Sequence, residues 1–316
     1  MDDSRIADVV VATDGSDPAA AAVGTAFSLA SALDAGVHPC TVVNPFVIGR
    51  TVADLSDARE EAERRVEDLA ERAREAGLDA APAVREGRVV AELLAHAGET
   101  DADLIVVGTH GRGGARRALL GSVAEKLIRT ADVPVLVVPA AVRESEGAGR
   151  EWGPDTRVLL ATDGSDAAAP AERVGVGLAG ALGARLVAVS VVDEPGTVAN
   201  VGGGLLTEET IAAVRRALDE GADEAVGRVL DRASEAGVDA EGEVIGGEPS
   251  RAIRGYAADT DADLIVVGTH GRGGIRRIVL GSVAERVVRG ADRPVLVVPA
   301  AAGTLAEDEP AAESGG

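Results

Sequence analysis

This chain has very few cysteine and aromatic residues. Cys40 is the single cysteine among 316 residues, which excludes an intrachain disulfide and a cysteine-rich metal site. Aromatic residues make up only 1% of the sequence, so any core must be built from Val, Leu, Ile and Ala. No apolar run approaches the roughly 18 residues of a membrane span, and Asp2 and Asp3 stand where a secretory signal needs basic residues. We therefore expect a cytoplasmic protein without a membrane partner.

Positive charge is also scarce. Lys126 is the only lysine, and 31 basic residues stand against 53 acidic ones, which leaves a formal charge of −22. This charge repels nucleic acid and anionic membranes, so no nucleic-acid partner is expected. An acid-rich surface nearly free of lysine predicts a halophilic protein, because high salt screens the repulsion between acids. An ordinary acidic cytoplasmic protein is the alternative.

The chain is rich in internal repetition. DADLIVVGTHGRGG occurs at 101–114 and again at 261–274, and each copy continues into a similar segment, ARRALLGSVAE or IRRIVLGSVAE. The two halves also open alike, with VVVATDGSD and VLLATDGSD. The repeat predicts two tandem domains at 1–141 and 155–301, joined by a linker at 142–154. An acidic Ala/Gly/Pro tail at 302–316 is expected to be disordered.

Each half alternates short apolar runs with helix-like segments. In the first half we expect strands at 7–13, 39–43, 81–85, 104–107 and 135–138, and helices at 18–35, 56–76, 89–100 and 122–130. The second half repeats the order, with a first strand in 157–166, further strands at 186–193, 241–247 and 295–298, and a charged helix at 208–236. This pattern predicts an α/β fold of two doubly wound, Rossmann-like domains, each with a five-stranded parallel sheet of order 3-2-1-4-5.

Prolines bracket the last predicted strand of each half, VLVV. They are Pro134 and Pro139 in the first half and Pro294 and Pro299 in the second. Proline is tolerated at sheet edges rather than in central strands, and a bare apolar edge strand promotes aggregation. Pairing of the two last strands would cover both edges, so we expect an internal pseudo-dimer, open to further homo-oligomer assembly. Two independent domains in series are the alternative.

The fourth predicted strand of each half runs into a glycine-rich loop and then a helix. The loop has the spacing G-x2-G-x9-G-S, and no acid lies in 104–124 or 264–284, where three arginines occur in each half. Ser122 and Glu125 have the form of a capping box. This arrangement favours an anion at the amides of the helix start. A tight turn before a capped helix, with the arginines paired to acids elsewhere, is the structural alternative.

Asp14 and Asp163 follow the first strand of each half, inside T-D-G-S. Asp-Gly is a turn dipeptide and Ser16 or Asp17 can cap the next helix, so a structural role is one interpretation. The other is an acceptor for ribose hydroxyls or a ligand for Mg²⁺. Neither half contains a G-x4-G-K-[ST] loop, and the four histidines lack metal-ligand spacing.

The signature G-x2-G-x9-G-S, the opening ATDGSD, the GTHGRGG loop and the closing PVLVVP together resemble the universal stress protein family over nearly the whole chain. In that family the loop and the serine bind ATP phosphates, the Asp after the first strand lies at the ribose and metal, and an apolar residue of the second strand touches adenine. The resemblance implies one ATP in each domain, with Mg²⁺ at the two aspartates. The expected nucleotide-binding residues are Asp14, Val42, Gly108, His110, Gly111, Arg112, Gly121, Ser122, Asp163, Val191, Gly268, His270, Gly271, Arg272, Gly281 and Ser282.

Three functions are compatible with these residues. The favoured one is a cytoplasmic ATP-binding stress-response protein that acts through its bound state. A slow ATPase or nucleotide phosphohydrolase would need His110 or Asp14 as a base or metal ligand, and we assign no catalytic residue because no nucleophile–base pair is evident. A scaffold that binds no nucleotide is the third. Eleven extra residues in the second half, expected within 194–210, could gate its site.

Overall fold

The computed structural model describes residues 5–46, 52–109, 120–140, 142, 151–193, 207–269, 280–300 and 302. The strands of the first half are β1 (Asp8–Ala12), β2 (Gly36–Val43), β3 (Ala83–Glu86), β4 (Leu104–Gly108) and β5 (Val135–Val138). Its helices are α1 (Asp17–Leu33), α2 (Val52–Glu75), α3 (Val89–Glu99) and α4 (Ser122–Thr130).

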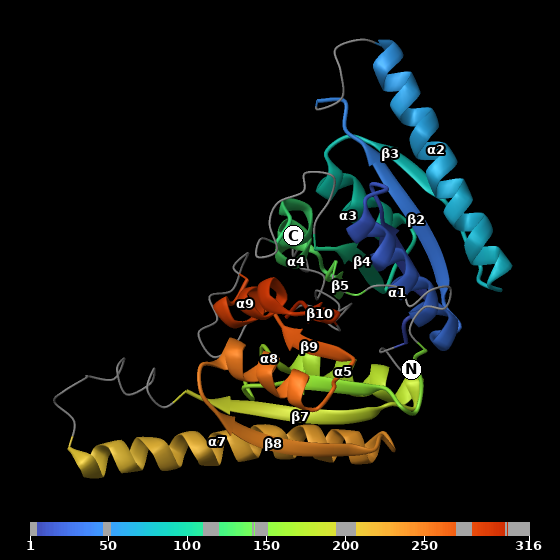
Figure 1. The fold of residues 1–316 in the computed structure, drawn as a ribbon. Coiled ribbons are helices and arrows are strands. Elements are labelled where there is room, and N and C mark those ends of the chain that lie inside the picture. Colours follow the sequence, from blue (N-terminus) through green and yellow to red (C-terminus); the bar gives the residue numbers. More distant parts are fainter. Residues whose placement is uncertain are drawn as a thin grey trace, which may run out of the picture.

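The second half follows the same order (Figure 1). Its strands are β6 (Arg157–Ala161), β7 (Arg185–Val192), β8 (Ala240–Gly246), β9 (Leu264–Gly268) and β10 (Val295–Val298). Its helices are α5 (Ala169–Leu182), α7 (Glu208–Glu235), α8 (Pro249–Asp259) and α9 (Ser282–Gly290). None of the described helices is both long enough and apolar enough to cross a membrane.

The ten strands of the described residues form one sheet of order β3-β2-β1-β4-β5-β10-β9-β6-β7-β8. Strands within each half are parallel, which confirms the doubly wound order 3-2-1-4-5. β5 and β10 pair antiparallel at the centre, with Leu136 opposite Leu296. The two VLVV strands therefore cover each other's edges, and the halves form the expected internal pseudo-dimer (Figure 1).

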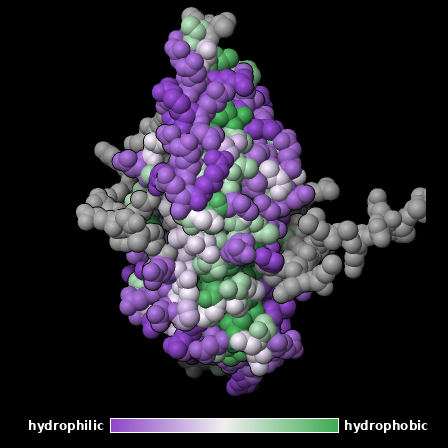
Figure 2. Space-filling model, turned by 90° about the vertical axis from the view of Figure 1, so that its right-hand side faces the viewer, coloured by the Kyte–Doolittle hydropathy of each residue, from purple (hydrophilic) through white to green (hydrophobic). Residues whose placement is uncertain are grey.

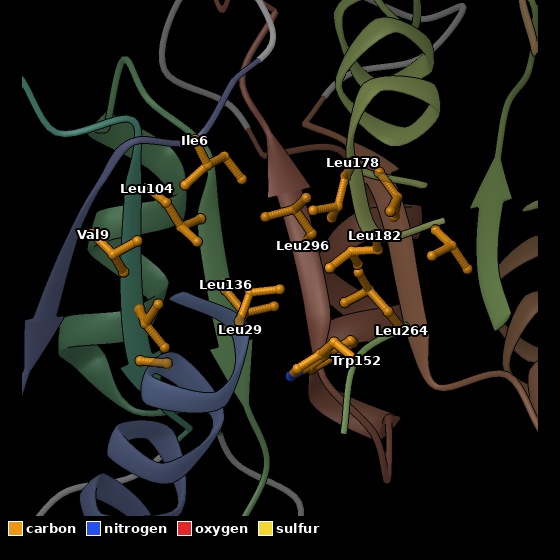
Figure 3. Close-up of a cluster of buried hydrophobic side chains, with 14 of the residues drawn as sticks. Ile6, Val9, Leu29, Leu104, Leu136, Trp152, Leu178, Leu182, Leu264 and Leu296 are labelled. Atoms are coloured by element: carbon orange, nitrogen blue, oxygen red, sulfur yellow. The ribbon is translucent and has the colours of Figure 1, made fainter. Parts of the chain in front are cut away.

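The helices cover the sheet on both faces, in two layers that run through both halves. Residues of α1, α2, α5 and α7 build one apolar cluster, and residues of α3, α4, α8 and α9 build the other. Both strands at the junction are fully buried, as expected for apolar runs covered on both sides. Figure 3 shows Leu136 and Leu296 facing each other across the junction, with Trp152 nearby. The aliphatic core predicted from the composition is thus shared between the halves.

The segment joining the halves contributes to this core. Trp152, within the predicted linker, is buried and donates its indole Nε1–H to the Ser28 hydroxyl of α1 at 3.0 Å. Because Trp152 is the only tryptophan, its fluorescence reports on the packing of the linker against the first half. Of the predicted tail, residues 303–316 lie outside the described residues.

The first helix of each half, α1 or α5, starts with a proline in its first turn. In α1 the Ser16 hydroxyl accepts a hydrogen bond from the Ala19 amide, and Pro18 occupies the first turn. In the second half the proline comes later in the repeat, and α5 begins accordingly at Ala169 with Pro170 in its first turn. Four of the eleven extra residues of the second half lengthen α7, which has 28 residues against 24 in α2.

Candidate functional site

The candidate site residues of each half are brought to one edge of the sheet. β1 lies beside β4, with Val9 opposite Leu104, so their carboxyl ends carry Asp14 and Gly108 on the same edge. β6 and β9 are neighbours in the same way, with Val158 opposite Leu264. In doubly wound sheets ligands bind outside the carboxyl ends of strands where the chain direction switches. The expected adjacency of the first and fourth strands is therefore confirmed in both halves.

The T-D-G-S turns have nearly the same geometry in the two halves. Asp14 Oδ1 accepts hydrogen bonds from the Ser16 amide at 3.0 Å and the Ser16 hydroxyl at 2.6 Å. Asp163 Oδ1 accepts from Ser165 at 3.0 and 2.7 Å. Gly15 and Gly164 follow with φ of 77° and 73°, a region that favours glycine. Each aspartate is half-buried and held in a fixed orientation by its own turn.

The two ends of each glycine-rich loop are joined by a backbone hydrogen bond. The Gly121 amide donates to the Thr109 carbonyl at 2.6 Å, and the Gly281 amide donates to the Thr269 carbonyl at 2.7 Å. Thr109 is itself bonded through its amide to the Val138 carbonyl of β5. The ends of each loop are thereby fixed at the carboxyl edge. The loop residues predicted to bind nucleotide lie outside the described residues: His110, Gly111, Arg112, His270, Gly271 and Arg272.

The predicted capping box at the start of α4 is wrong. Gly121, in an extended conformation, is the N-cap residue, and Ser122 is already the first helical residue. Glu125 instead pairs with Arg129 at 3.1 Å. No side-chain hydrogen bond caps α4 or α9 within the described part of the chain. Among the described residues no side chain partners the first-turn amides of either helix, an arrangement that suits an anion.

Gly108 has a packing role that the sequence did not reveal. A Cβ atom placed on this buried residue would lie 2.6 Å from the Pro18 carbonyl oxygen and 2.9 Å from its carbonyl carbon. Only glycine lets the start of α1 approach the end of β4 this closely. The first glycine of the signature thus sets the distance between the D-G-S turn and the loop.

Val42 and Val191 occupy corresponding places near the carboxyl ends of β2 and β7. Both are half-buried apolar side chains at the border of one core cluster, which suits contact with a flat apolar group. Gly121 and Gly281 are half-buried, whereas Ser122 and Ser282 are exposed. Each half therefore combines apolar, carboxylate and amide groups along one edge.

A second polar cluster lies near the amino ends of the strands, away from this edge. His38 Nε2 lies 2.8 Å from Asp8 Oδ1, and the His38 and His96 rings meet edge to face at 6.1 Å. Burial, the nearby His38 and Arg85 lower the pKa of His96. Burial also raises the pKa of the Cys40 thiol to about 12, so this thiol stays protonated and unreactive. No group of three or more metal-ligating side chains occurs among the described residues.

Two arginines near the T-D-G-S turns were not singled out in the sequence. Arg65 of α2 lies over Gly15, and Arg228 of α7 donates to the Gly164 carbonyl. Both occur in helices rich in charged residues, so nothing local distinguishes them from solvent-facing arginines. Figure 2, which views the molecule from the side of α2, shows mostly hydrophilic side chains in its upper part, where α2 lies.

The comparisons with known proteins agree with this architecture. The sequence profile of the universal stress protein family matches residues 6–139 and again residues 156–299. The chain therefore belongs to the universal stress protein family and contains two tandem domains of that type.

Relatives with this name match one or both domains. A universal stress protein of Mycolicibacterium smegmatis is 30% identical over 311 residues, which span 92% of this chain and 96% of the relative. One of Methanocaldococcus jannaschii is 39% identical over 142 residues, covering 45% of this chain and 81% of the relative. The crystal structure of a universal stress protein from Archaeoglobus fulgidus has a TM-score of 0.69 at 21% identity, over 93% of this chain and 98% of that one. That likeness concerns the fold.

Proposed function

We propose that this protein is a cytoplasmic ATP-binding protein with one nucleotide site in each half, acting in the stress response through its bound state rather than turnover. The observation that carries the proposal is the start of α4 and α9, where glycine replaces a capping side chain beside a fixed aspartate turn. Helix starts of this kind bind phosphate through their amides and positive dipole end.

The residues at each edge suit the three parts of an adenine nucleotide. The phosphates would lie at the first-turn amides with the exposed Ser122 or Ser282, and the loop arginines Arg112 and Arg272 would supply positive charge. Further loop contacts are expected from His110, Gly111, His270 and Gly271. Asp14 or Asp163 would accept the ribose hydroxyls, and Val42 or Val191 would contact the adenine.

A divalent cation fits this arrangement only in company with the phosphates. Each edge offers one aspartate of the turn, and no cluster of metal ligands occurs in the described residues. Mg²⁺ commonly binds through one or two carboxylates together with substrate phosphates. Asp14 and Asp163 are therefore the candidate protein ligands of a Mg²⁺ that arrives with ATP.

Ser122→Asp and Ser282→Asp test the sites without weakening the helices. An acid in the first turn stabilises a helix, yet repels phosphate at the same amides. Titration calorimetry with Mg·ATP should show two sites in the parent protein, one in each single variant and none in the double variant. Ser122→Ala serves as the uncharged control and should keep most of the binding. Two-site binding by the double variant, or none by the parent protein, would overturn the proposal.

We also propose adaptation to high salt, because 53 acids and a single lysine give a charge of −22. The melting temperature, followed by Trp152 fluorescence, should rise steadily as KCl increases toward molar concentrations. A melting temperature that is indifferent to KCl would contradict this.

A further inference from the structure

The turn that carries Asp14 is covered by an arginine from another helix. The side chain of Arg65, in the middle of α2, is 17% exposed and pairs with Glu61 one helical turn earlier. A Cβ atom on Gly15 would collide with Arg65 Nε and lie 3.0 Å from its guanidinium carbon. The guanidinium therefore packs directly on the turn that orients the aspartate.

The second half makes a similar contact with a different residue. Arg228 of α7 donates through Nη2 to the carbonyl oxygen of Gly164. A Cβ atom on Gly164 would meet Arg228 Nη2 at 2.5 Å and the Cβ of Ala225 at 2.8 Å. The turn beside Asp163 thus touches both an alanine and an arginine of the same helix.

These two arginines are not equivalent in the repeat. EAGLDA at 75–80 aligns with EAGVDA at 235–240, a separation of 160 residues that holds back through the preceding helix. Position 65 therefore corresponds to Ala225, and Arg228 corresponds to Asp68. The helix positions used are three residues apart, nearly one turn, so both lie on the same helix face. An alanine replaces arginine at one position, and an arginine appears one turn further on.

We infer that Arg65 and Arg228 are positioning residues of the two nucleotide sites. Each guanidinium packs on a left-handed glycine turn, and that of Arg228 also donates a hydrogen bond to it. Both therefore hold in place the turn that aims Asp14 or Asp163. The inference rests on the proposed function, since it assigns these arginines to the same sites. The recurrence of the contact from non-equivalent positions distinguishes it from a helix arginine that packs by chance.

Alanine substitutions should act on one site at a time. Arg65→Ala, measured in the Ser282→Asp background, should weaken Mg·ATP binding to the first half about tenfold, because a turn that is no longer held in place aims Asp14 less precisely. Arg228→Ala in the Ser122→Asp background should do the same for the second half. Adenosine binding should weaken by a similar factor, because the aspartate contacts the ribose rather than the phosphates. Arg72→Ala, an exposed arginine of α2, is the matched control and should leave affinity unchanged.

Moving the arginine gives the decisive test. Arg65→Ala combined with Asp68→Arg builds the second-half arrangement into the first half, and should restore the affinity lost in Arg65→Ala. The reciprocal pair, Ala225→Arg with Arg228→Asp, should keep the second site functional. Trp152 fluorescence melting should confirm that each variant is folded.

The outcomes separate this inference from the proposed function. If the parent protein binds no nucleotide, both fail. If it binds at two sites and folded Arg65→Ala keeps full affinity, the positioning role alone fails. If the folded transposed variant stays as weak as Arg65→Ala, a guanidinium on the turn does not account for the lost affinity, and the positioning role fails in this case as well.

Discussion

The first helix starts differently in the two halves, although their turns and strands match. α1 begins directly after Ser16, and its Pro18 carbonyl presses against Gly108. In the second half Ala167 stands in the corresponding place, ahead of α5, and Gly268 is half-buried where Gly108 is buried. The D-G-S turns nevertheless have the same hydrogen bonds and the same left-handed glycine. The turns that carry Asp14 and Asp163 therefore have the same geometry, although the helices that follow them start and pack differently.

A buried carboxylate marks the same difference. Glu172 of α5 is 3% exposed and accepts a 2.6 Å hydrogen bond from the Thr162 hydroxyl, just before the turn. The corresponding residue of the first half is the buried Val23, and Thr13 corresponds to Thr162. The threonine hydroxyl before the second turn thus has a buried carboxyl partner at a position where the first half has a valine. Variants that treat the two halves alike should therefore have unequal effects.

The largest effect is expected where the halves are joined. Leu296 lies opposite Leu136 across the β5–β10 pair, and both are 1% exposed. Leu296→Ala should lower the free energy of unfolding by about 2–5 kcal/mol, because it leaves a cavity at the junction. Urea unfolding followed by Trp152 fluorescence measures this. A loss below about 1 kcal/mol would mean that the junction adds little to the stability of either half.

The next largest effect should differ between Gly108 and Gly268, the first glycines of the two signatures, which lie at the ends of β4 and β9. Gly108→Val forces a side chain against the Pro18 backbone and should cost about 1–3 kcal/mol, with loss of nucleotide binding in the first half. Gly268→Val should cost less, since α5 starts farther along the chain. Thermal melting and calorimetry compare the pair. Equal losses would show that the later start of α5 does not give a side chain at position 268 more room.

The threonines before the two turns offer a matched pair of smaller changes. Thr162→Val removes the hydroxyl bonded to buried Glu172 and should cost about 1.5–3 kcal/mol. Thr13→Val loses only a 3.2 Å bond from the Gly15 amide, so about 0.5–1.5 kcal/mol is expected. Chemical denaturation of both variants decides the order. The reverse order would contradict the stabilising role of the Glu172 contact.

Ion pairs between α4 and α9 should matter less than any of these. Arg129 lies 3.1 Å from Glu125 in its own half but 3.7 Å from Glu285 in the other, and both pairs are partly exposed. Glu285→Gln should therefore cost under about 1 kcal/mol, and the loss should shrink in high KCl. A double-mutant cycle with Arg129→Ala isolates the contact across the halves. A coupling well above 1 kcal/mol would indicate a much stronger link between the halves than these distances suggest.

The smallest effect concerns pH. The pKa of His96 lies below 6.5 in the folded protein, mainly because of burial. The unfolded chain then binds more protons as the pH falls below 6.5, so stability present above this pH is lost on acidification. The second half has Tyr256 at the corresponding position. His96→Tyr should flatten the decline of the melting temperature between pH 7 and pH 5.5, and an unchanged decline would show that other groups cause it.

Most of the fold could be predicted from this sequence, because apolar runs, flanking prolines and the internal repeat can be recognised without a structure. Buried parallel strands are short apolar runs. The proline-bracketed VLVV strands identified the pairing between halves, because such flanks are typical of the edge strand of a single half and a bare apolar edge needs a partner. The repeat then fixed which segments correspond. These features depend on residue type and spacing alone.

The site was less predictable, because its geometry depends on neighbours far away in the chain. Ser-x-x-Glu looks the same whether the serine caps a helix or is its first residue, and the extended Gly121 decided the matter. Arg65 and Arg228 resemble surface arginines until α2 and α7 are placed on the sheet. Glu172 sits in an Ala-rich helix, and its burial became apparent only once Thr162 was placed beside it.

We propose that one chain holds two adenine nucleotides at two separate edges of its sheet. Equilibrium dialysis against labelled Mg·ATP, at saturating concentration and in high KCl, counts the nucleotides per chain directly. We expect two for the parent protein and one for Ser122→Asp. A plateau at zero or one nucleotide in the parent protein would contradict it.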